Sequence, residues 1–530
     1  MADAVPPTAH RVIVVGAGVG GLVSALLLAG RGLQVTLVEA QAAPGGKMRR
    51  VEVDGAFIDA GPTVFTMRWV FDEILSSVGS RLEDLLSLKP LSVLARHAWR
   101  GDEQRLDLHA DRDRTADAIG QFAGAEQARR YLGFCEEAAR IYQRLEGPHI
   151  RSAKPSFLQM VARLGPAGLG ELAALGPMAS LWRTLGRHFT DPRLRQLFGR
   201  YATYCGGSPW LAPATLMLVA HVEQNGVWAV DGGMHALAQA LAQRARELGA
   251  SLRFATPVQR ILVEGGRAVG VQLADGQVLQ ADSVVFNGDV QALSDGLLGP
   301  QVRRAAPSVP RQQRSLSALT WAVHARTHGF DLARHNVFFD DDYRSEFDDI
   351  FRRRQLPRKG TVYVCAQDRG EGGAWQPGRA MPERLLCLVN APAEGDRRLF
   401  DPQETDPCQE HTLALMRQCG LHIESSPRQV LLTTPTHFNR LFPASGGALY
   451  GPATHGWMML FRRSGAASRV PGLYLAGGGV HPGPGVPMAA LSGRLVAETL
   501  MAHLDLTSRS RRVAISGGIS TPSATTAGTG

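Results

Sequence analysis

A glycine-rich segment near the N-terminus has the residue types and spacing that bind a dinucleotide. Gly16, Gly18 and Gly21 follow the apolar run Arg11–Val15, and Glu39 lies 18 residues beyond Gly21. In this pattern the first glycine permits a tight turn, the second admits a pyrophosphate, and the third lets a helix pack on a strand. The helix N-terminus attracts phosphate, and the acid accepts a ribose hydroxyl. A glycine-rich turn in an ordinary α/β domain is the alternative, but strand, glycines, helix and acid together favour the nucleotide site.

Further glycines beyond the second expected strand favour FAD over NAD. They lie in the turn Gly45–Lys47 and in the string Asp59–Thr63. An NAD-binding unit would usually continue straight into another strand and helix, whereas these glycines suggest a longer ligand lying across the sheet edge. We therefore predict that Gly46, Lys47 and Gly61 bind the cofactor. Lys47 is either near phosphate or a solvated surface lysine, and the sequence does not separate the two.

A second glycine-rich loop lies near the C-terminus. It has five glycines and three prolines within residues 477–487, and a helix is expected to follow it. The N-terminus of that helix carries partial positive charge, which would stabilise an anionic reduced flavin ring. His481 is the one titratable side chain in the loop. It is either a polar group at the reaction face, which makes it our catalytic candidate, or a histidine that bonds the backbone and shapes the loop, which we favour.

The composition narrows the class of protein. The length of 530 residues suggests three or four domain-sized units. Charged residues make up 20% of the chain, which excludes a fully disordered one. Six cysteines exclude a disulfide scaffold, and without a Cys-x-x-Cys pair we expect no metal site. The net charge of +9 fits an anionic membrane surface or nucleic acid but is a signature of neither. We expect no nucleic acid as a partner. The motifs Gly-x-Ser-x-Gly and His-Glu-x-x-His are absent.

The elements that must position these residues are read from hydrophobic periodicity. Val12–Gly30 is uncharged and almost long enough to cross a bilayer, but its glycines divide it into a strand, a turn and a helix. We expect no cleavable signal, since Met1–His10 lacks a basic region. The stretch from Trp69 to about Cys205 is expected to be mostly helical. The other expected strands and helices are Gln34–Glu39, Ser251–Ala255, Val258–Val263, Ala268–Leu273, Ser283–Asn287 and Leu473–Leu475 (strands), and Gly21–Gly30, His235–Leu248 and Met488–Leu504 (helices).

The expected organisation alternates cofactor and substrate parts. Residues 1–75, 221–290 and 446–506 are predicted to form three FAD-binding segments. Residues 76–220 form a helical, membrane-associating and substrate part, and residues 291–445 form a substrate domain. Residues 507–530 are rich in Ser, Thr, Gly and Ala and are predicted to be a disordered tail.

Taken together, the motifs resemble the bacterial carotenoid desaturases, a flavoprotein family that includes phytoene desaturase. The resemblance covers roughly residues 10–504. Beyond the motifs above, it rests on Gly226–Met234 and on the His-Pro-Gly-x-Gly-x-Pro loop at 481–487. It implies FAD as cofactor and an α/β fold. In that fold a glutathione-reductase-like Rossmann domain is assembled from separated segments and accompanied by a mixed α+β substrate domain.

The resemblance also implies roles for individual residues. Gly16, Gly18, Gly21 and Glu39 would hold the adenosine diphosphate half of FAD. Val258 would contact the adenine through its backbone. The residues implied to line the flavin ring are Gly478, Gly479, Pro487 and Met488.

Within the family, Gly61–Met67 and Tyr204–Thr215 look closest to the 1-hydroxycarotenoid 3,4-desaturase type, and Val480 replaces the Thr common in phytoene desaturases. The implied reaction makes a C3=C4 double bond in a hydroxylated acyclic carotenoid. Hydride removal from C4 leaves a cation delocalised along the polyene, so only a weak base is needed afterwards, and flavin accepts the hydride. His221 and Glu223 are candidates to bind the hydroxyl, with a core histidine and a surface acid as the alternative.

A carotenoid substrate partitions into bilayers, so we expect the protein to bind a lipid bilayer surface. The sparsely charged stretch Phe157–Trp182 suits an interfacial helical pair, or alternatively a buried helix. The expected location is peripheral, on the cytoplasmic side of the bacterial inner membrane. Without a second dinucleotide motif, oxygen or a quinone is the expected electron acceptor. Phytoene desaturation, polyene cis–trans isomerisation and non-catalytic lipid carriage remain alternatives.

Overall fold

A five-stranded parallel sheet forms the centre of the cofactor half. The computed structural model describes residues 10–154, 159, 162, 165, 170, 179–370, 381–456 and 458–515. The strand order is β20-β13-β1-β2-β9, and every pairing is parallel. The strands are β1 (Arg11–Val15), β2 (Gln34–Val38), β9 (Ser251–Arg253), β13 (Ser283–Phe286) and β20 (Leu473–Leu475). One sheet therefore draws its strands from three separated stretches of the chain.

The two faces of this sheet are covered differently. Val12 and Val14 pack with the helices α1 (Val19–Ala29), α10 (Met234–Glu247) and α16 (Val486–Ile515), whereas Ile13 and Val15 pack with a small antiparallel sheet. This alternation follows from the two-residue period of a strand. The small sheet consists of β10 (Val258–Glu264), β11 (Arg267–Leu273) and β12 (Val278–Gln280).

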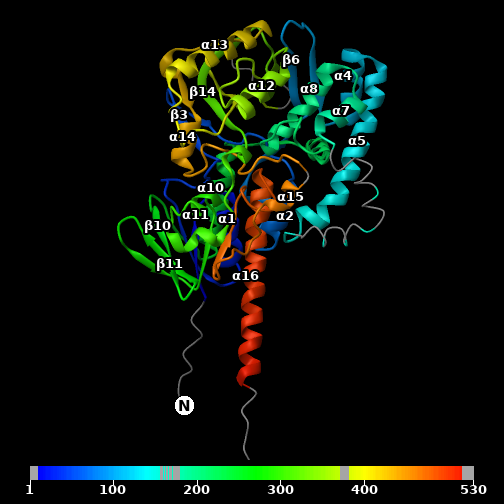
Figure 1. Cartoon of the computed structure of the whole chain (residues 1–530). Coiled ribbons are helices and arrows are strands. Elements are labelled where there is room, and N and C mark those ends of the chain that lie inside the picture. Colours follow the sequence, from blue (N-terminus) through cyan, green and yellow to red (C-terminus); the bar gives the residue numbers. More distant parts are fainter. Residues whose placement is uncertain are drawn as a thin grey trace, which may run out of the picture.

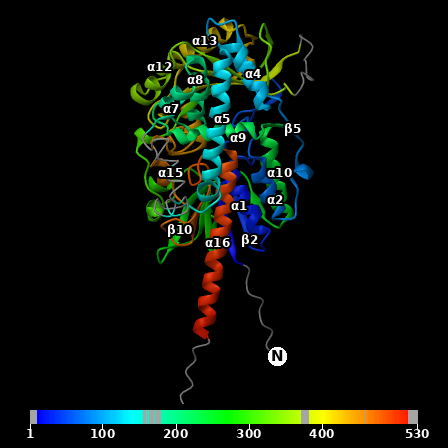
Figure 2. The same cartoon turned by 90° about the vertical axis from the view of Figure 1, so that its right-hand side faces the viewer.

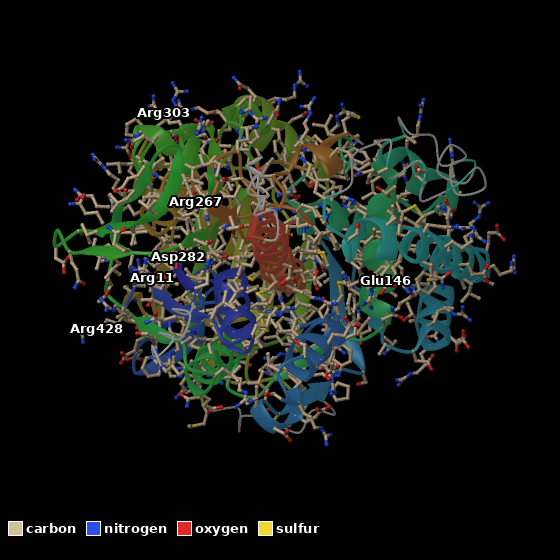
Figure 3. All side chains as sticks on the ribbon, turned by 90° about the horizontal axis from the view of Figure 1, so that it is seen from below. Arg11, Glu146, Arg267, Asp282, Arg303 and Arg428 are labelled. Atoms are coloured by element: carbon tan, nitrogen blue, oxygen red, sulfur yellow. The ribbon has the colours of Figure 1, made fainter. Side chains whose placement is uncertain are left out.

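An ion pair lies at the end of the parallel sheet where the strands begin, opposite the glycine loop. Arg11 Nη2 lies 3.2 Å from Asp282 Oδ1, and Arg267 Nη2 donates to the Asp282 carbonyl at 3.0 Å. Seen from below, these three residues gather on one side of α16 and Glu146 lies on the other (Figure 3). The contacts fix the beginnings of β1 and β13 beside each other.

A second, mixed sheet forms the substrate half, at the top of Figure 1, where β14 and β6 are labelled. Its strand order is β18-β14-β17-β16-β15-β6-β7, and β19 pairs with β14. Its strands are β6 (Val93–Trp99), β7 (Arg105–His109), β14 (Ser317–His328), β15 (His335–Phe339), β16 (Val362–Ala366), β17 (Glu383–Ala391), β18 (His422–Glu424) and β19 (Val430–Thr433). The remaining strands form two separate two-stranded antiparallel sheets. One pairs β3 (Arg50–Val53) with β4 (Ala56–Asp59), and the other pairs β5 (Leu88–Pro90) with β8 (Trp228–Val230).

The expectation that Trp69 to Cys205 is mostly helical is wrong for its first third. β6 and β7 lie there, and β6 pairs in parallel with β15, more than 200 residues later in the chain. In β7 the buried Leu106 and Leu108 alternate with charged residues, which is a strand pattern. The partner that completes β6 is distant in sequence, so local periodicity alone did not reveal it.

The remaining helices are shared between the two halves of the molecule. Those within residues 68–85 and 290–294 pack in the cores around the parallel sheet, and most of the others flank the substrate sheet. They are α2 (Arg68–Ser76), α3 (Leu82–Leu85), α4 (Arg112–Ala123), α5 (Ala125–Leu145), α7 (Leu181–His188), α8 (Pro192–Gly199), α9 (Leu218–Gln224), α11 (Val290–Ser294), α12 (Tyr343–Asp348), α13 (Pro402–Gln418), α14 (Pro435–Leu441) and α15 (Met459–Arg462). Most of the predicted interfacial stretch Phe157–Trp182 lies outside the described residues. In the part that the structure describes, every helix is too short or too polar to span a bilayer.

The C-terminal helix α16 begins inside the molecule and extends well beyond its body (Figures 1 and 2). It ends at Ile515, so the predicted boundary of a disordered tail at residue 507 is wrong. Residues 507–515 contain no glycine or proline and include three arginines, which favour a helix. Residues 516–530 lie outside the described residues.

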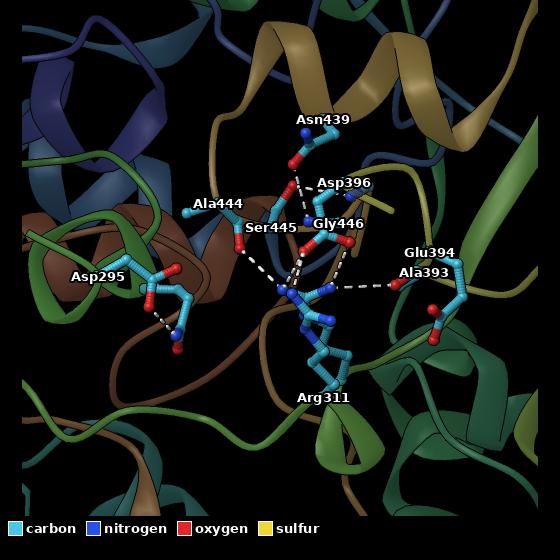
Figure 4. A network of polar contacts seen from close by, with 12 residues as sticks. Asp295, Arg311, Ala393, Glu394, Asp396, Asn439, Ala444, Ser445 and Gly446 are labelled. Atoms are coloured by element: carbon cyan, nitrogen blue, oxygen red, sulfur yellow. Dashed lines mark hydrogen bonds and ion pairs between the residues drawn. The ribbon is translucent and has the colours of Figure 1, made fainter. Parts of the chain in front are cut away.

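Ionic contacts around the buried Arg314 fix the segments that connect the two halves (Figure 4). Arg314 binds Asp396 through two hydrogen bonds of 2.9 and 2.8 Å, and it also donates to the carbonyls of Ala393 and Ala444. Arg311 lies 3.7 Å from the same carboxylate. A two-pronged pair of this kind is both strong and directional, so it fixes the start of β14 against the loop that follows β17.

Candidate functional site

The loop between β1 and α1 admits only glycine at its key positions. Gly16 has a φ of +99°, in the left-handed region that glycine adopts most readily. A methyl group on Gly18 would lie 2.7 Å from Asn287 Nδ2, and one on Gly21 would overlap the Gly16 carbonyl oxygen. The N-terminus of α1 is therefore pressed against the carboxyl ends of β1 and β13, as the nucleotide-binding pattern predicts.

Glu39 holds the loop together from the end of β2. Its buried carboxylate accepts hydrogen bonds from the Ala17 N–H at 2.6 Å and the Gln41 N–H at 2.8 Å. A carboxylate has about four acceptor positions, so it can still accept a ribose hydroxyl. The Thr256 N–H donates to the Glu39 carbonyl at 2.7 Å, which brings the strand that begins at Val258 beside this acid. Val258 thus lies two residues beyond a residue that is hydrogen-bonded to Glu39, and the contact of either one with the adenosine half stays a prediction.

Three positions fit a bound FAD better than they fit the protein alone. Asn287 Oδ1 is buried without a hydrogen-bond partner in the described chain, while its Nδ2 donates to the Gly16 carbonyl at 3.3 Å. Methyl groups on Gly478 and Gly479 would meet nothing closer than 3.7 and 4.0 Å, and neither residue has a left-handed φ. Neither crowding by the protein nor backbone conformation requires glycine there, whereas the predicted close approach of a flavin ring would.

The second glycine turn packs directly on the first. The Gly45 N–H donates to the Ala17 carbonyl at 2.9 Å, and a methyl group on Gly46 would lie 3.1 Å from the Gly18 Cα. Lys47 Nζ donates to the Leu449 carbonyl at 2.6 Å, and burial lowers its pKa. Lys47 makes no ion pair with any described residue and is not a solvated surface lysine. Its contact with phosphate stays a prediction.

The string Asp59–Thr63 meets the Gly226–Met234 motif. The buried Asp59 carboxylate accepts hydrogen bonds from the backbone N–H groups of Met234 and His235, the first two residues of α10. A carboxylate is favourable at a helix N-terminus, although burial raises the pKa of Asp59. A methyl group on Gly61 would overlap the Lys47 carbonyl. Both strings therefore serve to hold the chain close around the cofactor loops.

The His481 side chain is hydrogen-bonded to the backbone. Its Nε2 donates to the Ser152 carbonyl at 2.9 Å, and its ring lies edge-on to His149 with centroids 4.8 Å apart. Burial lowers the pKa of His481 to about 4, so the ring is neutral at pH 7. Its Nδ1 is buried without a hydrogen-bond partner in the described chain. This geometry matches a histidine that shapes the loop, and a catalytic role stays a prediction.

The flavin-side loop is braced by an arginine that the sequence did not mark. Arg463 donates to the carbonyls of Gly478 at 3.0 Å, Pro452 at 2.9 Å and Tyr450 at 3.2 Å. Burial lowers its pKa to about 10. Pro487 and Met488 lie in the first turn of α16, directly after this loop. The predicted flavin-lining residues thus share one rigid unit.

On the substrate side, Glu223 is a buried acid and not a surface one. Its Oε2 accepts a hydrogen bond from the Tyr201 hydroxyl at 2.8 Å, and burial raises its pKa. His221, two residues earlier in α9, contacts Asn225 and the Tyr142 ring instead. The structure therefore separates the two residues that the sequence analysis paired.

Comparisons with known proteins agree with this geometry. The family described as flavin containing amine oxidoreductase matches residues 19–501. A hydroxyneurosporene desaturase from Rubrivivax gelatinosus is 66% identical over 523 residues, covering 99% of both chains. One from Cereibacter sphaeroides is 47% identical, covering 94% of this chain and 99% of its own. A putrescine oxidase bound to putrescine, 16% identical with a TM-score of 0.58, shares the fold and covers 94% of this chain and 100% of its own.

The matches confirm FAD as the cofactor and oxidation–reduction as the class of chemistry. The likeness to the putrescine oxidase concerns the fold alone, because its sequence identity is low. The chain therefore belongs to the flavin-containing amine oxidoreductase family and, within it, to the carotenoid desaturases.

Proposed function

We propose that this protein introduces a C3=C4 double bond into a 1-hydroxylated acyclic carotenoid, with 1-hydroxyneurosporene as the first substrate to test. The observation that carries the proposal is the full-length similarity to hydroxyneurosporene desaturases. A buried polar group in the substrate half, Glu223 with Tyr201, supports a substrate that has a polar end.

The arrangement of the site indicates which tasks fall to the cofactor and which fall to the protein. FAD, when bound, supplies the two-electron acceptor for the hydride that leaves C4. The glycine loops and Glu39 bind and orient the cofactor, and Arg463 fixes the loop beside its ring. The substrate cation is delocalised along the polyene, which makes the C3 proton acidic. A weak base is then sufficient, and a neutral, backbone-bound His481 does not argue against the reaction.

The test is turnover of three carotenoids by the purified, FAD-loaded protein, followed by chromatography with absorption spectra. We expect 1-hydroxyneurosporene to be desaturated much faster than neurosporene, with a product that absorbs at longer wavelength. Equal rates would contradict the hydroxycarotenoid assignment, and fastest turnover of phytoene would favour a phytoene desaturase. A product that differs only in double-bond geometry would indicate an isomerase, and binding without any turnover would indicate a carrier.

The electron acceptor we propose is oxygen or a membrane quinone, since the sequence has one dinucleotide motif and not two. Stopped-flow mixing of the reduced enzyme with air or with a soluble quinone tests this. Reoxidation by NAD alone would contradict it.

We also propose peripheral binding to the cytoplasmic face of the inner membrane. The substrate is a lipid, the net charge is +9, and Phe157–Trp182 is sparsely charged. The protein should sediment with anionic vesicles more than with neutral ones, and less at high salt. Phe157→Ser with Leu158→Ser should weaken sedimentation while FAD is retained. Unchanged sedimentation would exclude this segment from the interface.

A further inference from the structure

A polar cluster surrounds Arg200, at the start of the turn Arg200–Cys205 that follows α8. Arg200 Nη1 donates to the Tyr204 hydroxyl at 2.9 Å. The guanidinium also lies over two phenol rings, 5.1 Å from the centroid of Tyr204 and 5.3 Å from that of Tyr363. Among the described residues it makes no ion pair within 4.0 Å and no other side-chain hydrogen bond. A guanidinium has five N–H donors, so most of them have no protein acceptor.

The charge of Arg200 is balanced indirectly. The Tyr204 hydroxyl also lies near Glu223, whose carboxylate accepts a hydrogen bond from the Tyr201 hydroxyl at 2.8 Å. A phenol therefore stands between the cation and the acid. Arg200 is only partly exposed, and a cation with reduced hydration is costly unless hydrogen bonds satisfy it. This arrangement leaves room for one more acceptor on the guanidinium.

This cluster adjoins the cofactor loops on two sides. On one side, the Tyr363 hydroxyl lies 2.6 Å from Thr63 Oγ1, in the string that includes Gly61. On the other side, Thr454 Oγ1 donates to the Cys205 carbonyl at 3.2 Å, at the end of the same turn as Arg200.

The second side leads to the flavin loop in two further contacts. A methyl group on Gly206 would touch the Tyr450 ring. The Tyr450 carbonyl accepts from Arg463, and Arg463 donates to the Gly478 carbonyl. Arg200 is thus linked by short contacts to the Asp59–Thr63 string, which is expected to bind the cofactor, and to the loop that is expected to line the flavin.

The chemistry of the substrate requires a polar partner in this position. Four bonds separate a C1 oxygen from C4, so the two atoms are at most about 5 Å apart. A hydroxyl on a substrate that reacts at C4 must therefore lie within about one side-chain length of the flavin. Glycines and backbone carbonyls dominate the flavin loop itself. The Arg200 cluster supplies unpaired donors and is joined to that loop through Tyr450 and Arg463.

We propose that Arg200, held by Tyr204 and Tyr363, donates a hydrogen bond to the C1 oxygen and thereby selects hydroxylated carotenoids. This rests on the proposed function and assigns its specificity to one side chain. A carotenoid without the hydroxyl leaves those donors unpaired, and a site built to bind a hydroxyl rejects the analogue that lacks it.

The experiment compares Arg200→Met with the parent enzyme, both at full length and loaded with FAD. We expect kcat/KM for 1-hydroxyneurosporene to fall about 10- to 100-fold, the loss expected for one hydrogen bond to a charged group. Turnover of neurosporene should change by less than about 3-fold, because it makes no such bond. An unchanged ratio between the two substrates would overturn the proposal.

A matched control is Arg195→Met, in α8. Arg195 lies over the Trp182 ring at 4.5 Å and donates to the Trp182 carbonyl at 3.4 Å. The same loss of an arginine beside an aromatic ring should leave the substrate ratio unchanged. If both variants lowered it equally, Arg200 would have no special role.

Folding is checked by flavin absorbance and by the melting temperature. If Arg200→Met fails to hold FAD, Tyr204→Phe provides the same test, because it removes the hydroxyl that holds the guanidinium. A smaller preference for the hydroxylated substrate supports the proposal, and an unchanged preference contradicts it. A parent enzyme without any preference would instead contradict the proposed function. A parent preference that survives Arg200→Met would contradict the inference alone.

Discussion

The two sides of the site are built from different kinds of atoms. Around Gly16 and Gly46 the contacts join backbone to backbone, and Glu39 and Asn287 are the main side chains that take part. Around Arg200 the contacts join hydroxyl, carboxylate and guanidinium groups from segments between Thr63 and Tyr363. A site made of backbone tolerates almost no substitution and suits a cofactor that never changes. A site made of side chains can change its ligand through one substitution.

Gly21→Ala is the strongest test of the claim that the backbone side tolerates almost no substitution. The added methyl group would overlap the Gly16 carbonyl, a backbone atom that cannot move without displacing β1. Overpacking typically costs about 1–3 kcal/mol and occasionally more, and the overlap with a backbone atom places this substitution at the upper end. We expect purified protein without yellow colour and with a lower melting temperature, measured by absorbance and by thermal unfolding. A variant as yellow and as stable as the parent would show that the loop is looser than the structure indicates.

Glu39→Arg tests the one charged side chain on the backbone side. The substitution leaves the N–H groups of Ala17 and Gln41 without their acceptor and removes the partner of the ribose. Losing a hydrogen bond to a charged group costs about 1.5–3 kcal/mol, so FAD should dissociate on dilution where the parent retains it. Glu39→Gln, which keeps one acceptor oxygen, should have a smaller effect. Equal retention in Glu39→Arg would contradict our placement of the adenosine half.

The sequence predicted the backbone side well because its signals are local. β1 has the predicted bounds Arg11–Val15, and α10 differs from its predicted range by one residue at each end. The glycines, the acid and the apolar runs all lie within a few turns of chain. A periodic pattern and a spacing rule were therefore sufficient.

The side-chain half escaped prediction because its contacts are distant in sequence. Arg200 is one of 57 Lys and Arg residues, and nothing in its neighbours shows that it meets Tyr363. Asn287 was expected only as the end of a strand, and its role appears when β13 lies beside β1. The same reason explains why β6 was missed, since its partner β15 lies far along the chain.

The pH dependence of stability tests the substrate half. His335 Nδ1 lies 2.7 Å from the Tyr363 hydroxyl, and burial, with Arg334 and Arg200 nearby, lowers its pKa to about 3. In the unfolded chain this histidine has a pKa near 6.5. Between pH 6.5 and 3 the unfolded chain therefore binds a proton at His335 that the folded chain does not bind. Stability should therefore fall as the pH falls from about 6.5 toward 3, by up to about 1.4 kcal/mol per pH unit.

His335→Gln removes that contribution, so the variant should lose stability less steeply with acid. Urea unfolding at pH 6.5, 5.5 and 4.5 measures the slope. Gly133→Ala serves as the reference, because it should shift the whole curve without changing its slope. A slope equal to that of the parent in His335→Gln would show that the histidine is protonated in the folded protein.

The smallest expected effect comes from Gly133→Ala, which is the same glycine-to-alanine change as Gly21→Ala at a different position. Gly133 lies in the interior of α5 on its exposed side, has no left-handed φ, and a methyl group there would meet nothing within 4 Å. Alanine in place of glycine stabilises such a helix by about 0.5–1 kcal/mol, mainly by restricting the unfolded chain. The melting temperature should rise by about 1–3 °C, with FAD binding and substrate preference unchanged. Opposite signs for Gly21→Ala and Gly133→Ala would separate close packing from the general effect of glycine. A lower melting temperature for Gly133→Ala would mean that another molecule or segment packs against this side of α5 in solution.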